Sequence, residues 1–247
     1  MRDKKKISVV IPLYNEELRF EKGFKVCKGF ANRFPGWEFI FVNDGSTDKT
    51  KQLVKKAIKD KSAMRLISYE KNQGKGYALK QGVKEAVKPL ILICDIDFST
   101  PLSELTNLYP FIKKAEVVIG SRKVQGANIL KHQPKMREWL GKQFTNLSKL
   151  VLRLKVSDVT CGFKLFKKQA GKKLFGLSRI KRWGYDAEIL FLAKKHKMKM
   201  VDVPVTWQND ERTKVSMVRD IIQSLIDLWL IRWNDLLGNY STEAMPT

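Results

Sequence analysis

Short β-rich apolar runs alternate with amphipathic stretches through the first half of the chain. Runs that are apolar on both faces predict strands buried on both sides, and the stretches between them have the spacing of helices. This alternation favours an α/β fold with a mostly parallel central sheet flanked by helices. The predicted strands are residues 7–11, 39–42, 66–68, 90–94 and 117–120, and the predicted helices are residues 17–32, 49–59, 76–87 and 102–114.

The second half of the chain has a different pattern. Apolar residues recur at amphipathic helical spacing over residues 136–154, and residues 158–166 resemble a strand that returns to the sheet. A helix over residues 183–195 and a strand over residues 200–205 follow, and residues 218–237 predict a long helix with one apolar face. We therefore expect one domain over residues 1–216, then a C-terminal amphipathic helix and tail over residues 217–247, which is a candidate for membrane association.

Polar clusters stand where three of the predicted strands end. Tyr14 and Glu16 follow the first strand, Asp44 follows the second, and Asp95 and Asp97 follow a later one. In parallel sheets, ligands bind beyond the carboxyl ends of the strands. These clusters therefore predict one binding crevice.

The carboxylates of Asp95 and Asp97 point to a metal ion. Side chains two residues apart on a strand lie on the same side, so the two groups repel each other unless a cation lies between them. Hard oxygen ligands favour Mg²⁺ or Mn²⁺, and such ions usually also hold substrate phosphates.

Two further turns precede predicted helices. Residues 43–48 (NDGSTD) form a polar turn in which Ser46 or Thr47 is able to cap the next helix. Residues 72–78 (NQGKGYA) offer glycines that allow backbone to approach a phosphate and Lys75 to neutralise it. The segment has neither the third glycine of a dinucleotide fingerprint nor the spacing of a P-loop.

Composition narrows the partners only partly. The chain of 247 residues carries 48 Lys and Arg against 25 Asp and Glu, a formal charge of +23. This excess fits nucleic acid, a membrane surface or phosphorylated substrates, and its even spread along the chain does not select among them. Three separated cysteines without a CxxC pair disfavour zinc and disulfides and suggest a reducing compartment, and two histidines disfavour histidine-dependent chemistry. No apolar run approaches the roughly 20 residues that span a bilayer.

The motifs together resemble family 2 glycosyltransferases with the GT-A fold. The resemblance is carried by residues 8–16 (SVVIPLYNE), 42–48 (VNDGSTD), 72–78 and 95–97 (DID) in that order. Residues 120–122 (GSR), 161–166 (CGFKLF) and 184–190 (GYDAEIL) resemble the branch that makes polyprenyl-phosphate sugars, namely dolichyl-phosphate glucosyl- and mannosyltransferases. Trp207, followed by residues 213–216 (TKVS), is similar to the glucosyltransferase-like members.

The resemblance implies a role for particular residues. Asp44 would contact the base of the donor, Asp95 and Asp97 would contact the ribose side and the metal on the diphosphate, and Lys214 would bind the diphosphate from a closing loop. Arg122 and Arg137 would face donor or acceptor phosphates. The remaining residues expected at the donor are Pro12, Tyr14, Glu16, Lys75 and Ile96.

The chain departs from the family pattern in two ways. Ile96 stands at the centre of the acidic motif, where the branch often carries a small residue. Many relatives also carry C-terminal transmembrane helices, whereas this sequence shows none. The mode of membrane attachment is therefore open.

The expected reaction is inverting transfer of a hexose from a nucleotide sugar to a polyprenyl phosphate, with UDP-glucose favoured. GDP-mannose as donor and an envelope saccharide as acceptor remain alternatives. We expect a cytoplasmic protein bound peripherally to the cytoplasmic face of a membrane through the helices over residues 136–154 and 218–237. Alternatively, the apolar stripes of both helices pack on the core.

Two other classes are disfavoured. Residues 95–99 (DIDFS) approach the motif of haloacid-dehalogenase-type phosphatases, but there the nucleophilic aspartate follows the first strand and a later acidic loop is present. A nucleic-acid-binding protein fits the charge, but the sequence has no RNP-like, zinc or helix-turn-helix signature. We therefore expect no nucleic-acid partner.

Overall fold

The computed structural model describes residues 6–210 and 217–241. Within these residues, seven strands form a central sheet in the order β3-β2-β1-β4-β7-β5-β8. They are β1 (Ile7–Leu13), β2 (Glu38–Asp44), β3 (Met64–Tyr69), β4 (Leu90–Ile93), β5 (Val117–Ser121), β7 (Lys164–Lys167) and β8 (Met200–Pro204). A small parallel sheet pairs β6 (Asn128–Lys131) with β9 (Thr206–Gln208).

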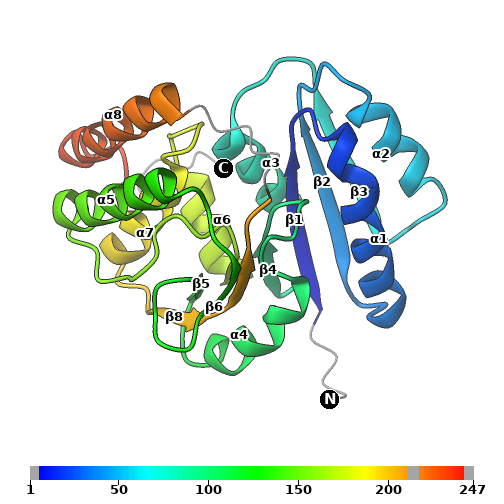
Figure 1. The fold of residues 1–247 in the computed structure, drawn as a ribbon, viewed down its shortest axis with the longest axis horizontal. Coiled ribbons are helices and arrows are strands. Elements are labelled where there is room, and N and C mark those ends of the chain that lie inside the picture. Colours follow the sequence, from blue (N-terminus) through cyan, green and yellow to red (C-terminus); the bar gives the residue numbers. More distant parts are fainter. Residues whose placement is uncertain (1–5, 211–216, 242–247) are drawn as a thin grey trace.

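Helices cover both faces of the sheet (Figure 1). In chain order they are α1 (Glu17–Arg33), α2 (Thr50–Ile58), α3 (Lys75–Glu85), the 3-10 turn η1 (Leu102–Glu104), α4 (Leu105–Ile112), α5 (Lys135–Leu152), α6 (Lys168–Leu177), α7 (Tyr185–Lys195) and α8 (Met217–Leu236). The predicted α/β class, with a mostly parallel sheet flanked by helices and a C-terminal amphipathic helix, is confirmed.

The strands distribute their side chains between two apolar cores. In β1, Val9 and Ile11 pack in the core beneath α1, α2 and α4, whereas Val10 packs with α3 and α6 on the other face. Alternate residues of β2 and β4 divide in the same way. Because successive strand residues face opposite sides, a strand buried on both faces is apolar at nearly every position. This explains why the sequence pattern located these strands.

Strand β7 corrects one prediction. Residues 158–166 were expected to be a strand, but the strand begins at Lys164, and residues 158–163 form a loop. β7 lies antiparallel between β4 and β5, while the other neighbouring pairs of the central sheet are parallel. Helix α6 and strands β6 and β9 were not predicted.

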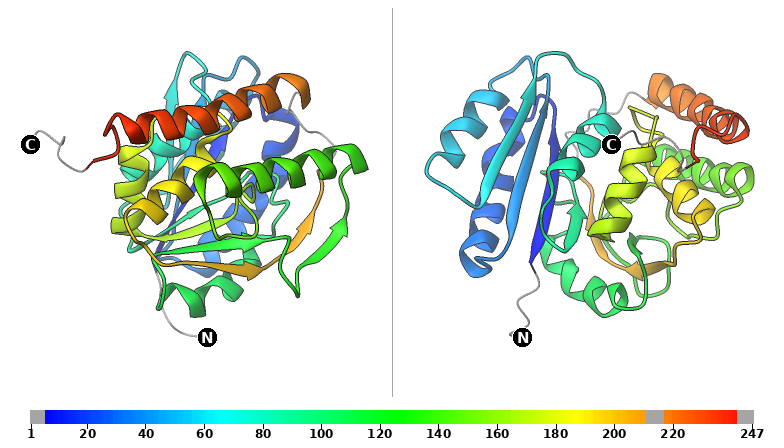
Figure 2. Two further views of the ribbon diagram at one scale, coloured as in Figure 1. Left: turned by 90° about the vertical axis from the view of Figure 1, so that its left-hand side faces the viewer. Right: turned by 180° about the vertical axis from the view of Figure 1, so that it is seen from behind.

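The C-terminal helix packs on the rest of the fold. Leu228 and Ile231 of α8, with Tyr240 beyond it, belong to the same buried cluster as α3 and α7. The Tyr240 hydroxyl donates to Oε1 of the buried Glu188 on α7 at 2.6 Å. α8 lies beside α5 on the side of the molecule opposite α1 and α2 (Figures 1 and 2). The division at residues 216 and 217 stays a prediction.

Candidate active site

The carboxyl ends of β1, β2 and β4 open onto a cleft of about 890 Å³. The parallel register of these strands brings the segments that follow them to one edge of the sheet. Ten residues selected from the sequence line this cleft: Pro12, Tyr14, Glu16, Asp44, Lys75, Asp95, Ile96, Asp97, Arg122 and Arg137. Lys214 lies outside the described residues. The geometry therefore gathers the predicted residues, and their individual roles stay predictions.

Asp44 lines the cleft and organises the loop before α3. Its carboxylate is 2% exposed and accepts hydrogen bonds from Nδ2 of Asn72 at 2.8 Å, the amide of Gln73 at 2.8 Å and the amide of Gly74 at 2.9 Å. A carboxylate with three such donors holds its loop in one conformation. Asp44 thus has a structural role beside the base contact predicted for it.

The loop after β1 is tied to the loop after β2. Asn15, at a positive φ of 53°, accepts the Thr47 amide through Oδ1 at 2.8 Å, and its own amide donates to Ser46 Oγ at 2.9 Å. The prediction that Ser46 or Thr47 caps the next helix is wrong, because both residues bind Asn15 and α2 begins later, at Thr50. This pairing fixes Tyr14 and Glu16 beside the cleft.

Asp95 and Asp97 face two cations that the structure places beside them. Lys75 Nζ lies 2.7 Å from Oδ1 of Asp95, and a guanidinium nitrogen of Arg19 lies 3.5 Å from Oδ2 of Asp97. Burial, followed by repulsion from Asp95, raises the pKa of Asp97 above its ordinary value. The cleft thus holds two crowded carboxylates that a positive charge stabilises.

The sequence interpretation did not include Arg19. Arg19 donates from Nε and from a terminal nitrogen to the two oxygens of Glu16, each at 2.6 Å, so that its fork is held toward Asp97. The sequence does contain a signal for this pair. Glu16 and Arg19 stand three residues apart at the start of a predicted helix, and side chains at that spacing meet on one face.

The glycines of residues 72–78 have a packing role, and the phosphate approach expected of them stays a prediction. A Cβ on Gly74, which has a φ of 106°, would lie 2.5 Å from the carbonyl oxygen of Lys181, and one on Gly76 would lie 2.7 Å from that of Ile180. Both glycines therefore allow the segment before α7 to pack closely on α3. Lys75 between them points to Asp95 and lies 5.3 Å from the centre of the Trp183 ring.

The side chain of Ile96 belongs to the core, although the residue lines the cleft. It is buried, and a Cβ on Gly23 of α1 would lie 2.8 Å from its Cδ1. Ile96 therefore packs under α1 and separates the two aspartates without contributing a polar group.

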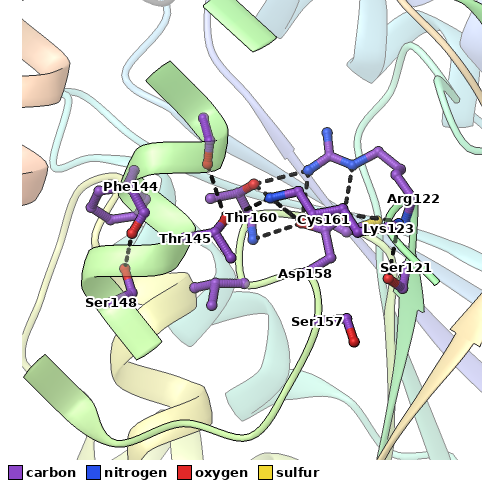
Figure 3. A network of polar contacts seen from close by, with 12 residues as sticks. Ser121, Arg122, Lys123, Phe144, Thr145, Ser148, Ser157, Asp158, Thr160 and Cys161 are labelled. Atoms are coloured by element: carbon purple, nitrogen blue, oxygen red, sulfur yellow. Dashed lines mark hydrogen bonds and ion pairs between the residues drawn. The ribbon is translucent and has the colours of Figure 1, made fainter. Parts of the chain in front are cut away.

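Arg122 is held by a buried carboxylate. Its Nε and one terminal nitrogen donate to the two oxygens of Asp158 at 2.7 and 2.9 Å, and that terminal nitrogen also donates to Thr160 Oγ1 at 2.8 Å (Figure 3). The Trp207 ring lies 5.4 Å from the guanidinium carbon. The residues that hold Arg122 lie in the 158–163 loop that was expected to be a strand, which is why the sequence did not identify them.

A second arginine approaches Arg122 from α5. Arg137 lines the same cleft, and burial followed by the positive charge of Arg122 lowers its pKa. Lys123 adds a third cation, and its Nζ donates to Thr145 Oγ1 of α5 at 2.7 Å (Figure 3). Cations gathered on one side of a cleft favour an anionic ligand there.

A buried lysine holds the 158–163 loop in place. Lys164 Nζ donates to the carbonyl oxygens of Val159 at 3.2 Å and Cys161 at 2.5 Å, and it pairs with the carboxylate of Asp186. Gly162 of this loop would place a Cβ 2.9 Å from Oδ2 of Asp95. The loop thus contacts both Arg122 and the acidic pair.

The donor set at Asp95 and Asp97 fits a hard divalent cation. Carboxylate oxygens are the ligands that Mg²⁺ and Mn²⁺ prefer, and the mutual repulsion of the pair is relieved by a bound cation. Among residues 6–210 and 217–241, no group of three His, Cys, Asp or Glu side chains is placed to hold a metal. A cation here would therefore take its other ligands from water and substrate phosphates.

The pair of Asp158 and Arg122 predicts a pH-dependent stability. Burial works against ionisation of Asp158, but Arg122 and Lys123 outweigh it and hold the pKa well below its ordinary value of about 3.9. The carboxylate therefore contributes its full stability above pH 4 and loses it as the pH falls through the lower folded-state pKa. We expect Asp158→Asn to lower the free energy of unfolding by about 3 kcal/mol at pH 7.

Urea unfolding at a series of pH values measures this difference. The difference in the free energy of unfolding between wild type and Asp158→Asn should be constant from pH 5 to 8 and should become smaller below pH 4. A difference that is unchanged at pH 3, or one that disappears near pH 6, would contradict the lowered pKa of Asp158.

Comparison with known proteins shows the family of this chain. Residues 8–175 match the family described as Glycosyl transferase family 2. The chain is 32% identical over 246 residues to the dolichyl-phosphate beta-glucosyltransferase ALG5C of Trichomonas vaginalis, covering 90% of this chain and 73% of the relative. It is 32% identical to the dolichyl-phosphate beta-glucosyltransferase of Saccharomyces cerevisiae, covering 95% and 76% of the two chains.

Solved structures show the same fold at low sequence identity. The glucosyl-3-phosphoglycerate synthase of Mycobacterium tuberculosis, solved with Mn²⁺, UDP-glucose and phosphoglyceric acid, has a TM-score of 0.66 and 14% identity over 92% of this chain and 79% of that one. The mannosyltransferase PcManGT of Pyrobaculum calidifontis, solved with GDP-Man and Mn²⁺, has a TM-score of 0.63 and 18% identity over 93% and 64%. With the family match and the yeast and Trichomonas relatives, these observations place the chain in glycosyl transferase family 2, as an enzyme of the GT-A fold.

Proposed function

We propose that this enzyme transfers glucose from UDP-glucose to a polyprenyl phosphate of the dolichyl type at a membrane surface. The observation that carries the proposal is the charge arrangement of the cleft, which has an acidic pair at the strand ends and arginines on the α5 side. The 32% identity to dolichyl-phosphate beta-glucosyltransferases supports the choice of sugar and acceptor.

The donor would lie along the ends of β1, β2 and β4. Pro12, Tyr14, Glu16 and Asp44 line this part of the cleft and would surround the nucleoside. Asp95 and Asp97 would hold Mg²⁺ or Mn²⁺ against the diphosphate, with Lys75 beside them and Lys214 reaching the diphosphate. When bound, such an ion stabilises the negative charge that develops on the leaving diphosphate.

The acceptor phosphate would lie at Arg122 and Arg137. Asp158 and Thr160 fix the Arg122 fork, and α5 brings Arg137 to the same cleft, so two guanidinium groups meet one phosphate. A phosphate monoester is already mostly ionised near neutral pH, because its second pKa is about 6. The acceptor thus needs orientation more than deprotonation.

The transfer itself would be a single in-line displacement. The acceptor oxygen forms a bond to the anomeric carbon while the bond from that carbon to the diphosphate breaks, so UDP leaves and the configuration inverts. Lys75 and Arg19, already beside the acidic pair, would keep the two carboxylates in place while charge moves to the leaving group.

Helices α5 and α8 offer an apolar surface beside the cleft. Met136, Trp139 and Leu150 of α5 are exposed, and so are Trp229 and Trp233 of α8, at 68% and 60%. None of the helices within the described ranges has an apolar stretch of the length that a bilayer span requires. We propose that this surface docks on the cytoplasmic face of a membrane, since tryptophans suit the interface and the basic chain suits anionic lipids.

Identification of the lipid product tests the function. Purified protein is incubated with short polyprenyl phosphate, Mg²⁺ or Mn²⁺ and, in turn, UDP-glucose, GDP-mannose and other nucleotide sugars. We expect a glucosylated lipid from UDP-glucose, and we expect Asp97→Ala to lower its rate at least ~100-fold with the fold retained. Glu21→Ala, a change to an exposed acidic residue on α1, is the control.

Two results would contradict this account. Transfer by Asp97→Ala at the wild-type rate would remove the role of the acidic pair. Preference for GDP-mannose, or transfer only to a saccharide, would replace the proposed donor or acceptor.

Flotation with anionic vesicles tests the membrane surface. We expect the wild type to float with the vesicles. The bound fraction of a Trp229→Ser/Trp233→Ser variant should be about tenfold lower, because two aromatic rings that would insert into the membrane interface are missing. Leu18→Ser on α1, where the leucine is 80% exposed, is the matched control and should float like the wild type. A wild-type protein that stays in the soluble fraction would show that the surface does not bind lipid.

A further inference from the structure

A carboxylate of α8 reaches inward instead of facing solvent. Asp227 is a charged residue of the predicted amphipathic helix and would be expected on its polar face, yet it is only 3% exposed. Burial raises its pKa above the ordinary value. A buried carboxylate costs free energy and adds little net stability, so its presence suggests a further role.

Asp227 holds the segment just before α7. Its Oδ2 accepts the amide of Gly184 at 3.2 Å, and its Oδ1 accepts Nε2 of Gln223 from the same helix at 3.0 Å. A Cβ on Gly184 would lie 2.4 Å from Cβ of Asp227, so helix and segment meet without space for a side chain. The carboxylate also stands at the first turn of α7, where negative charge is favoured.

The segment that Asp227 holds reaches the acidic pair. Lys181, in the same segment, accepts the Tyr77 amide through its carbonyl oxygen at 3.0 Å. The Trp183 ring lies 5.3 Å from Nζ of Lys75, and Lys75 pairs with Asp95 at 2.7 Å. Residues 182 and 183 line the cleft as well. A continuous series of contacts therefore runs from α8 to Asp95.

We propose that Asp227 is a positioning residue for the reaction centre. From α8 it fixes residues 181–184, so that Trp183 confines Lys75 to the position in which it pairs with Asp95. The inference rests on the proposed function, because it concerns the donor side of the same cleft. It adds that the helix proposed to dock on lipid also sets the geometry of the acidic pair.

Kinetics of variants with UDP-glucose, Mn²⁺ and short polyprenyl phosphate test this role. We expect Asp227→Ala to lower kcat/KM for the donor about tenfold per folded protein, and Asp227→Asn to restore most of it, because the amide oxygen still accepts from Gly184. Trp183→Ala should lower kcat/KM by a similar factor. The double variant Asp227→Ala/Trp183→Ala should be no slower than the slower single variant, because both changes interrupt one series of contacts.

Asp235→Ala is the matched control. Asp235 lies two turns further along α8 and pairs with Lys195 and Arg232, away from the cleft. It should leave kcat/KM within twofold of the wild type. Circular dichroism and thermal unfolding give the folded fraction of every variant, so that a loss of fold is corrected for.

The outcomes separate this inference from the proposed function. If the wild type transfers sugar and folded Asp227→Ala has an unchanged kcat/KM, the positioning role is wrong and the function stands. If the loss of kcat/KM in the double variant equals the product of the losses in the two single variants, Asp227 does not act through Trp183. If the wild type transfers no sugar from any donor, the proposed function fails and the inference fails with it.

Discussion

The repulsion between Asp95 and Asp97 is the constraint on which the rest of the site depends. Two carboxylates at the end of β4 are stable in a partly buried cleft only when positive charge is near. The fold supplies that charge through Lys75 of α3, which pairs with Asp95, and Arg19 of α1, which lies beside Asp97. Both cations are themselves held, Lys75 by Trp183 and Arg19 by Glu16. We propose that this arrangement admits a further cation and the anionic diphosphate that it would bring.

Buried hydrogen bonds and ion pairs also hold the loops around the cleft. Asp44 gathers three donors of the 72–74 turn, Asp158 holds the fork of Arg122, and Lys164 binds two carbonyl oxygens of the loop that contains Asp158. The partners of Asp44 and Asp158 come from distant parts of the chain, whereas the two carbonyl oxygens that Lys164 binds lie within five residues of it. Such contacts restrict the positions of the side chains that line the cleft.

The sequence predicted the parallel part of the fold well because strands buried on both faces leave a strong pattern. It failed at β7, where polar and apolar residues alternate over residues 158–163 (DVTCGF) but form a loop whose carbonyl oxygens bind Lys164. Whether a strand runs parallel or antiparallel depends on its neighbours, which the local pattern does not contain. The short strands β6 and β9 have little burial and so gave no signal.

The site followed the same rule. Residues within motifs, such as Lys75, Asp97 and Arg122, were selected from the sequence, whereas their partners Trp183, Arg19 and Asp158 were not. The glycines at 74 and 76 were assigned to phosphate approach, and the sequence did not indicate that they also accommodate the backbone of residues 180 and 181. A close approach between segments about a hundred residues apart is visible only in the folded chain.

Titration of UDP into the protein measures the central claim most directly, because it asks whether the acidic pair joins a cation to a diphosphate. Calorimetry is run with and without Mn²⁺, on the wild type and on Asp97→Ala. We predict that Mn²⁺ strengthens UDP binding to the wild type about tenfold or more. For Asp97→Ala, the UDP affinity should be the same with and without Mn²⁺. Equal UDP affinity with and without Mn²⁺ in the wild type would contradict the account.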